Sequence, residues 1–256
     1  MKISIIGAGN GATQLALAFR KAGHEILQVF NRSQGAGKEL AKTVGAVFIS
    51  DIKQLDAADV FLIAVRDDVI ADIASQIKVN GVVAHTSGTK TLNLLKLSSA
   101  NFGILYPLQT MTKNQKLDFS NVPILVDGNN SETKEQLIAL AKSISKKVFE
   151  ADEEQRQWIH VAAVFANNFT NHLYSLSEKI LIEHDLSFEI LKPLIAKTAD
   201  NINHFSPSKI QTGPAKRGDK LVIEKHLQLL GDEERLKKVY EILTESIQTE
   251  TLNSKP

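Results

Sequence analysis

A glycine-rich segment near the start of the chain constrains the fold more than any other feature of the sequence. Gly7, Gly9 and Ala12 form the pattern G-x-G-x-x-A directly after the β-branched run "KISIIG" and at the start of an amphipathic stretch. In such a turn the first glycine permits a sharp bend, the second lets the backbone approach a diphosphate, and the small third residue lets the helix pack against the strand. A second strand-like run, "HEILQVF", follows one helix later, as a βαβ unit of about 30 residues requires. The pattern therefore predicts a dinucleotide site, with a packing corner as the alternative.

The second predicted strand ends in residues that favour one dinucleotide over the other. NAD sites usually place an acidic residue there to bind the ribose 2′-hydroxyl, whereas this chain has Asn31, Arg32 and Ser33. Arg32 can pair with a 2′-phosphate or stack on adenine, while Asn31 and Ser33 donate hydrogen bonds. We therefore predict NADP as the cofactor. The alternatives are an NAD site or a solvated loop arginine.

The first 150 residues alternate short β-branched runs with amphipathic stretches. This alternation is typical of strands joined by helical crossovers in a mostly parallel, doubly wound sheet. The predicted strands are "KISIIG", "HEILQVF", "AVFIS", "DVFLIAV", "GVVAHT", "FGILY", "PILVD" and "KKVFEA". The predicted helices cover residues 12–22, 34–44, 68–77 and 132–145, the third capped by Asp68 and the last by Ser131.

The periodicity after residue 150 is helical throughout. The segment "DEEQRQWIHVAAVFANNFTNHLYSLSEKILIEH" is long enough for about eight helical turns. Further on, Asp219 is a predicted N-cap, Gly231 a predicted helix end, and residues 233–247 a final helix. We therefore predict an α/β protein with two domains: a doubly wound, mostly parallel Rossmann sheet in residues 1–150, followed by an all-α domain in residues 151–256 for substrate binding and dimerisation.

Composition excludes several classes of partner. The 30 Lys and Arg residues nearly balance the 29 Asp and Glu residues, and no block of like charges is present, so neither a nucleic acid nor a membrane surface is an expected partner. The uncharged stretch from Trp158 to Ser177 contains three asparagines and two histidines, which are costly in hydrocarbon, so we do not expect it to span a membrane. The absence of cysteine fits a reducing compartment. Because a strand begins at Lys2 or Ile3, where a secretory signal would lie, we expect a cytoplasmic protein with a small-molecule substrate.

Ligands of open α/β sheets bind beyond the carboxyl ends of strands, and three further strand ends carry distinctive residues. The run "FLIAV" leads into Ala64–Arg66, which should pass along the cofactor. The run "FGILY" leads to Gln109, a substrate-binding candidate. The run "VVAH", between these two, leads to His85, Thr86, Ser87 and Gly88, which can form hydrogen bonds with the nicotinamide amide or a substrate oxygen. The alternative for His85 is a buried histidine bonded to backbone, and for Ser87 a simple turn.

Two groups in the second half of the chain are further candidates. His160, Asn167, Asn171 and Glu178 form one polar stripe on an uninterrupted helix, although most such stripes are solvent faces. His160, His172 and His184 are spaced by twelve residues, about 120° apart in direction, so no metal site is expected. Lys216 and Arg217 can bind an acidic substrate or the cofactor phosphates, or are exposed loop cations.

Several motifs also resemble known families. "GAGNGA", "NRS" and "AVRDDVI" resemble the NADP-binding half of the 6-phosphogluconate dehydrogenase-like superfamily, which includes pyrroline-5-carboxylate reductase and deazaflavin-dependent NADP oxidoreductases. "HTSG", "YPLQT" and "GPAKRGD" resemble a narrower bacterial family in which a Rossmann-like domain precedes a helical domain of unknown function, labelled as NADP oxidoreductases. The resemblance extends to about residue 247 and implies an NADP-dependent oxidoreductase that forms a homodimer.

The resemblance also implies where the reaction takes place. In related dehydrogenases the first long helix lines the cleft and carries a lysine three positions before an Asn-Asn pair. Asn167-Asn168 is similar to that pair, but Val164 occupies the lysine position, so His160 is the candidate substitute as proton donor.

The sequence thus predicts an oxidoreductase that transfers a hydride between NADP and a small C=O or C=N substrate. The alternative is an NADP-binding sensor without turnover. The candidate catalytic residues are His85, Ser87, His160 and Asn167. The candidate substrate-binding residues are Gln109, Asn171, Lys216 and Arg217. The candidate cofactor-binding residues are Gly7, Ala8, Gly9, Asn10, Gly11, Ala12, Asn31, Arg32, Ser33, Ala64, Val65, Arg66 and Ser87.

Overall fold

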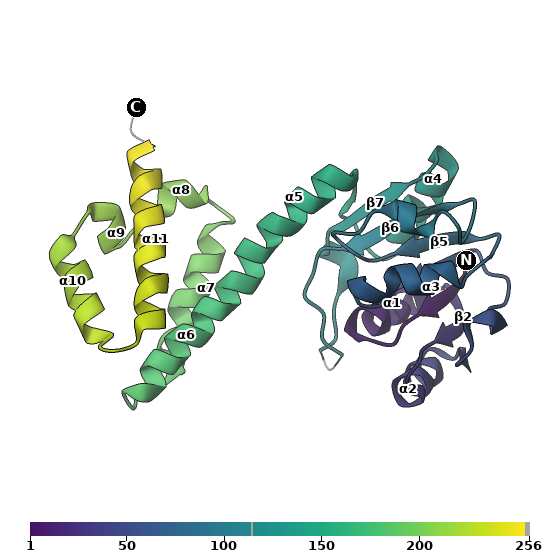
Figure 1. Cartoon of the computed structure of the whole chain (residues 1–256), viewed down its shortest axis with the longest axis horizontal. Coiled ribbons are helices and arrows are strands. Elements are labelled where there is room, and N and C mark those ends of the chain that lie inside the picture. The colour runs from purple at the N-terminus through teal and green to yellow at the C-terminus, as the bar shows by residue number, and fades with distance from the viewer. Residues whose placement is uncertain (114, 254–256) are drawn as a thin grey trace. The chain divides into compact units, whose positions relative to one another are not determined.

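The computed structural model describes residues 1–113 and 115–253, which form two compact units, Met1–Ala166 and Asn167–Pro256 (Figure 1). The sheet of the first unit ends at Glu150, and the helix that follows the sheet still belongs to this unit. The functional boundary at residue 150 stays a prediction, and residues 254–256 of the predicted second domain lie outside the described part of the chain.

The first unit is built on one eight-stranded sheet with the order β3-β2-β1-β4-β5-β6-β7-β8. Its strands are β1 (Lys2–Ile6), β2 (Glu25–Phe30), β3 (Val47–Ile49), β4 (Val60–Ile63), β5 (Val82–His85), β6 (Phe102–Pro107), β7 (Ile124–Gly128) and β8 (Val148–Glu150). All neighbouring pairs are parallel except β6 and β7. The predicted doubly wound, mostly parallel sheet is confirmed, and each of the eight predicted runs forms a strand.

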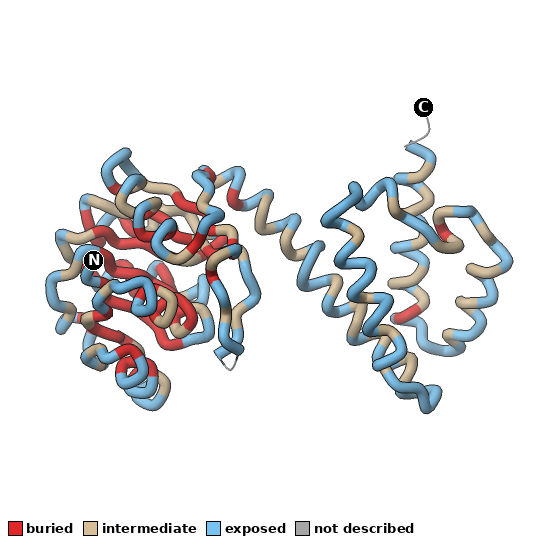
Figure 2. Tube along the Cα trace, turned by 180° about the vertical axis from the view of Figure 1, so that it is seen from behind, coloured by how far each residue is buried: buried red, intermediate tan, exposed pale blue. Residues whose placement is uncertain are grey.

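Helices cover both faces of this sheet, so its central strands are buried on both sides (Figures 1 and 2). Side chains alternate along β1: Ile3 and Ile5 pack in one core with α1 (Asn10–Lys21), α2 (Gln34–Val44) and α4 (Ser131–Lys142). Ile6 packs in a second core with α3 (Ile70–Ser75) and the 3₁₀ turn that follows β5. The continuous apolar runs of the sequence follow from this two-sided burial.

Two predicted caps are wrong. The N-cap of α4 is Asn130, whose side chain accepts a 2.8 Å hydrogen bond from the Thr133 amide; Ser131 is already the first helical residue. Asp68 does not cap a helix, because its carboxylate binds the Arg66 guanidinium and a 3₁₀ turn, Asp67–Val69, precedes α3. Asn130 thus makes the capping bond predicted for Ser131, whereas the carboxylate of Asp68 is occupied by Arg66.

The predicted long helix is interrupted. Helix α5 (Glu153–Ala163) is followed by a π-helical segment, Val164–Phe169, and then by α6 (Thr170–Glu183). A π turn closes i→i+5 hydrogen bonds and so changes the helical phase. The stripe predicted from His160 to Glu178 assumed uninterrupted 3.6-residue geometry, and that assumption is wrong.

The second unit is helical, as predicted. After α6 come α7 (Lys192–Asn201), α8 (Pro207–Ile210), α9 (Pro214–Arg217), α10 (Lys220–Leu229) and α11 (Glu234–Asn253). Asp219 caps α10 through the Val222 amide at 3.3 Å, and Gly231, with φ +54°, follows its end, so both predictions are confirmed. Figure 2 shows how few residues of these helices are buried compared with the first unit.

Candidate functional site

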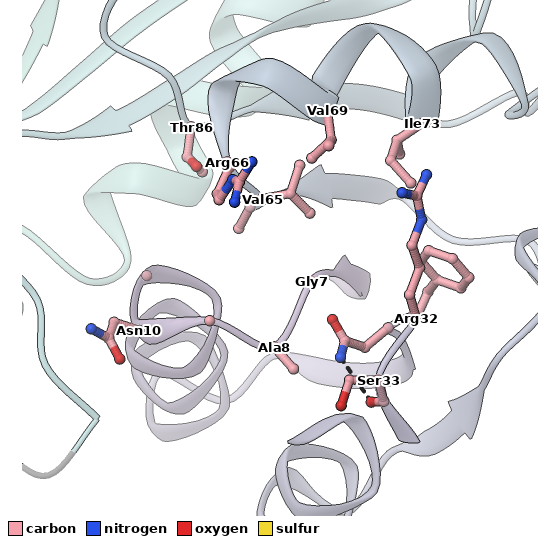
Figure 3. A pocket seen from close by; sticks show the side chains of 15 residues that line it. Gly7, Ala8, Asn10, Arg32, Ser33, Val65, Arg66, Val69, Ile73 and Thr86 are labelled. Atoms are coloured by element: carbon pink, nitrogen blue, oxygen red, sulfur yellow. Dashed lines mark hydrogen bonds between the residues drawn. The ribbon is translucent and has the colours of Figure 1, made fainter. Parts of the chain in front are cut away.

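A cavity of about 720 Å³ lies in the first unit beyond the carboxyl ends of β1, β2 and β4 (Figure 3). Strand β1 lies between β2 and β4, so the cavity is at the point where the strand order reverses, the usual ligand site of open α/β sheets. Its lining is Gly7, Ala8, Gly9, Asn10, Gly11, Phe30, Asn31, Arg32, Ser33, Ala64, Val65, Arg66, Val69, Ile73 and Thr86. Of the candidate cofactor residues, only Ala12 and Ser87 are outside this set.

The turn after β1 can be made only by a glycine at its first position. Gly7 has φ +120°, a conformation that side-chain-bearing residues rarely adopt, and its amide donates a 2.8 Å hydrogen bond to the Phe30 carbonyl. A Cβ at Gly7 would lie 2.3 Å from the Ala64 carbonyl oxygen. The turn is therefore pressed against the end of β4, and residues of both segments line the cavity.

The next residues of the turn leave space for a ligand. A Cβ on Gly9 would meet no atom within 4 Å, although Gly9 lines the cavity. Gly9 is also the N-cap of α1, which has no side-chain cap and no acidic residue in its first turn. The positive end of α1 thus faces the cavity with its first amides available to an anion. Ala12 is fully buried in the core below, in the packing position that the sequence predicts.

Arg32, at the tip of β2, forms an ion pair with Asp72 of α3. Both side chains are more than half exposed. Asn31 donates a 2.8 Å hydrogen bond to the Ser33 carbonyl, and Ser33 precedes α2 as its N-cap without a side-chain capping bond. The end of the cavity expected to bind the adenosine ribose therefore has one cation, already paired, and one hydroxyl.

Arg66 and Asp68 form a second ion pair on the β4 side, with Nε of Arg66 3.0 Å from Oδ1 of Asp68. The hydrogen bond from Arg66 lowers the pKa of the Asp68 carboxyl. Three apolar residues of the lining, Phe30, Val69 and Ile73, were not predicted, because they belong to regular strand and helix patterns that indicate only core.

Ser87 organises the loop after β5 and is outside the cavity lining. Its hydroxyl donates a 2.6 Å hydrogen bond to Asp67 and accepts bonds from the Thr89 and Lys90 amides, each at 3.1 Å. Thr89 also donates to Asp67, at 2.8 Å. These bonds fit the alternative interpretation of Ser87 as a turn residue. The neighbouring Thr86 does line the cavity.

His85 is fully buried, and both of its ring nitrogens have backbone partners. Nδ1 accepts from the Ser87 amide at 3.1 Å, which leaves Nε2 to donate to the Thr91 carbonyl at 3.3 Å. Burial lowers the pKa of His85 to about 4, so the ring is neutral at physiological pH. The structure favours a buried, backbone-bonded histidine over a proton donor.

His160 does meet a polar partner in the first unit. Its Nδ1 lies 3.0 Å from the Tyr106 hydroxyl, at the end of β6. Both side chains are partly buried. Gln109, three residues after Tyr106, is exposed, and its side chain accepts a 2.9 Å bond from the Thr110 amide.

The remaining candidates belong to the second unit. Asn167 and Asn171 are exposed, the first within the π-helical segment and the second on α6. Lys216 and Arg217 lie on α9, and Lys216 lines a cavity of about 220 Å³ within this unit. No helix among the described residues is long and apolar enough to cross a membrane.

Comparison with known proteins agrees with this architecture. The family described as "NADP oxidoreductase coenzyme F420-dependent" matches residues 2–86, and the family "Domain of unknown function (DUF2520)" matches residues 122–247. No curated protein matches the sequence.

Among solved structures, a "putative NADP oxidoreductase" from Bacteroides fragilis is similar over nearly the whole chain. It is 35% identical, the match covers 97% of this chain and 98% of that one, and the TM-score is 0.89. A 1-pyrroline-5-carboxylate reductase from Streptococcus pyogenes shares the fold at 16% identity, with 97% and 98% coverage and a TM-score of 0.66. An imine reductase from Myxococcus stipitatus, in complex with NADP⁺, shares it at 15% identity, with 99% and 95% coverage and a TM-score of 0.64.

Proposed function

This chain belongs to the family of the Bacteroides fragilis protein, and from that premise we propose that it is an NADP-dependent oxidoreductase acting on a small molecule with a C=O or C=N bond. The observation that carries the proposal is the cavity at the strand-order reversal, which is formed by the Gly7 turn and the start of α1. The names of the two more distant fold relatives, both reductases and one bound to NADP⁺, support the same chemistry.

The residues of the cavity fit a dinucleotide. The backbone from Gly7 to Gly11 would bind the diphosphate, and the open space beside Gly9 leaves room for it. Val65 and Thr86, which also line the cavity, would contact the part of the cofactor beyond the phosphates. When bound, the nicotinamide supplies a hydride to the substrate carbon, and the protein orients both and excludes water.

Arg32 and Ser33 support NADP over NAD. A 2′-phosphate beside β2 would meet the guanidinium, the free hydroxyl of Ser33 and the positive end of α2. Asp72 opposes this binding, because its carboxylate holds Arg32 and repels the phosphate. We propose that, when NADP binds, the Arg32 guanidinium either breaks its ion pair with Asp72 or binds Asp72 and the 2′-phosphate together.

Calorimetric titration of both nucleotides tests the assignment. We expect Arg32→Ala to weaken NADP binding at least tenfold and NAD binding by less than twofold, since only NADP carries the phosphate. Asp72→Asn removes one repelling charge and should strengthen NADP binding about fivefold, the size of a partly screened charge interaction. Unchanged NADP affinity in Arg32→Ala would contradict the role of Arg32.

The reaction also needs a proton donor, and the candidates differ in suitability. We keep His160, and Asn167 as an orienting residue, in the proposed catalytic set, whereas His85 and Ser87 are better suited to shaping the loop beside the cofactor. Gln109, Asn171, Lys216 and Arg217 stay proposed substrate contacts. Val164 stands where related dehydrogenases have a lysine, so the donor must differ from theirs.

The competing hypothesis is a sensor that binds NADP without turnover. Bound NADPH is mixed with 1-pyrroline, cyclohexanone, pyruvate or a deazaflavin, and the nicotinamide absorbance is followed over a single turnover. An oxidoreductase oxidises the bound NADPH with at least one of these acceptors. If NADPH binds tightly and none of them oxidises it, the sensor hypothesis replaces the enzyme.

We also propose a homodimer, formed by the second unit. Large apolar side chains of this unit are widely exposed, including Leu221 at 80%, Leu229 at 68% and Ile242 at 65%. Exposed apolar side chains of this kind typically mark an interaction surface, and most soluble oligomers are homo-oligomers. A cytoplasmic location also stays a proposal, supported by the absence of cysteine.

A further inference from the structure

A tyrosine and a histidine meet at the end of β6 in the first unit. The Tyr106 hydroxyl lies 3.0 Å from Nδ1 of His160, which α5 carries, and the two ring centroids are 6.0 Å apart. Neither side chain is fully buried, so part of each stays exposed to solvent. The Tyr106 hydroxyl can donate to Nδ1, or accept from Nδ1 when that nitrogen carries the proton.

The contact depends on two features of the loop after β5. A Cβ at Gly88 would lie 2.8 Å from Nδ1 of His160 and 2.8 Å from Cζ of Tyr106, so a side chain there would separate the pair. Arg156, one turn before His160, is fully buried and donates a 2.7 Å bond to the Lys90 carbonyl. The loop therefore makes room for the pair and also anchors the helix that carries His160.

The pair is outside the lining of the cofactor cavity but lies at the same edge of the sheet as part of that lining. Strands β5 and β6 are parallel, so Thr86, which lines the cavity, and Tyr106 lie at the same edge of the sheet. Gly88, only two residues after Thr86, lies so close to both members of the pair that an added Cβ would collide with each of them. On the other side, Asp67 follows the cavity residue Arg66 and is bonded to Ser87.

The phenol keeps its proton at neutral pH. Burial, with a smaller contribution from the Asp67 carboxylate, raises the pKa of Tyr106 above its usual value. A protonated phenol can serve as an acid, whereas His85, the other histidine near this edge, has no free ring nitrogen.

We propose that Tyr106 is the catalytic acid of the reaction, and that His160 is the positioning residue that orients its hydroxyl and resupplies its proton. This proposal rests on the proposed function. Reduction of a C=O or C=N bond requires a hydride at carbon, which NADPH supplies, and a proton at the oxygen or nitrogen. The Tyr106 O–H bond breaks as the new O–H or N–H bond forms. The phenolate oxygen then takes the proton of Nδ1 while Nε2 of His160 takes a proton from water, and the hydroxide that remains is neutralised by the buffer.

The chain provides a matched control for this pair. In the second unit, Nδ1 of His226 lies 2.8 Å from the Tyr240 hydroxyl, so Tyr240→Phe removes the same kind of contact. Tyr240 and His226 belong to the second unit and, like Tyr106 and His160, are outside the lining of the nucleotide cavity. Any general effect of losing a Tyr–His hydrogen bond should appear in both variants.

The first measurement does not depend on activity. In ¹⁵N-histidine-labelled protein, Tyr106→Phe should shift the ring nitrogen signals of His160 and leave those of His226 unchanged, and Tyr240→Phe should do the reverse. NADPH affinity, measured by fluorescence, should stay within twofold of wild type in both variants. Unshifted His160 signals in Tyr106→Phe would overturn the coupling of the pair.

The second measurement is single-turnover oxidation of bound NADPH by 1-pyrroline and by cyclohexanone. We expect Tyr106→Phe to slow it at least 100-fold, the usual contribution of a positioned acid, and Tyr240→Phe to slow it less than twofold. A rate within threefold of wild type in Tyr106→Phe would overturn the proposal while leaving the proposed function intact. If wild type binds NADPH but neither acceptor nor any other of the panel oxidises it, the proposed function fails, and the proposal with it.

Variants of His160 separate proton supply from orientation. Glutamine can still donate a hydrogen bond to the Tyr106 oxygen but cannot pass on a proton. We expect His160→Gln to be at least tenfold slow, and His160→Ala to be partly restored by free imidazole in the buffer. Full activity in His160→Gln would show that His160 only orients Tyr106 and would overturn the proton relay.

Discussion

The two units of this protein bury their apolar residues to very different extents. In Met1–Ala166, two cores on opposite faces of the sheet contain fully buried side chains such as Ile5, Phe19 and Phe61. In the described part of the second unit, only Ala215 and Leu236 are buried hydrophobic residues, while Leu221 and Leu229 are largely exposed. The first unit therefore has the interior of an independent domain. The second unit has large apolar side chains too, but most of them are not buried.

This difference separates what each unit needs in order to be stable. Burial of a large aliphatic or aromatic side chain contributes about 1.5–3 kcal/mol, so a helical unit with two buried hydrophobic residues gains little from its own packing. A second chain that covers these helices would supply the missing burial. The comparison thus gives the proposed homodimer its physical basis.

The largest expected effect comes from charging the exposed apolar surface of the second unit. Ile190 and Leu194 are 64% and 63% exposed, and the double substitution Ile190→Asp, Leu194→Asp would place two carboxylates in a dimer interface. We expect light scattering to show a fall from about twice to once the 28.1 kDa mass of one chain. Leu97→Asp, at a 72% exposed leucine of the first unit, is the control and should leave the mass unchanged. A wild-type protein of single-chain mass would refute the proposed homodimer.

The next effect tests the close packing of the first unit at the cavity. Gly7→Ala forces a side chain into a positive-φ position and against the Ala64 carbonyl, at a cost on the order of 4 kcal/mol. Denaturant unfolding followed by the fluorescence of Trp158, the single tryptophan, measures it. Gly9→Ala is the matched control: it should unfold like wild type but bind NADP at least tenfold more weakly, because its methyl group enters the cavity. Equal stability of the two variants would show that the turn is not strained.

A smaller effect distinguishes a buried histidine of the first unit from an exposed one of the second. The pKa of His85 is lowered from 6.5 to about 4, so between these values the unfolded chain binds a proton that the native state does not. The contribution of His85 to the free energy of unfolding is therefore fully present above pH 6.5. It is lost as the pH falls toward 4, by about 3 kcal/mol in total. His85→Asn should flatten this part of the pH profile of unfolding, whereas His172→Asn, at an exposed position, should not. An unchanged slope in His85→Asn would rule out His85 as its source.

Most of the first unit could be predicted from its sequence because its pattern is local and strong. Strands buried on both faces appear as short apolar runs, and helix α2 begins and ends at the predicted residues, 34 and 44. The Gly7 turn is equally local, since three small residues determine both its bend and its contact with β4. The predicted N-cap of α4 is one residue away from the observed one, because Asn130 and Ser131 are both residue types that favour N-caps.

Contacts between residues far apart in the chain could not be predicted from the sequence. Asp72 binds Arg32 from 40 positions away, and His160 meets Tyr106 from 54 positions away, so neither pairing leaves a periodic pattern. The π-helical segment was missed for a different reason: its residues have ordinary helical preferences, and only the hydrogen-bond register distinguishes it. The second unit was recognised as helical, but periodicity alone does not say which apolar faces stay exposed.

The missing side chain at position 88 has a consequence for inheritance. Because even a methyl group there would push into both aromatic rings, an ancestral chain acquiring alanine would lose the bond between phenol and imidazole in a single step. Natural selection on that bond would then act on three codons together, those of Gly88, Tyr106 and His160. Homologues should retain all three or replace them as a set, and many sequences keeping the two rings beside a bulky residue 88 would mean that the bond is dispensable.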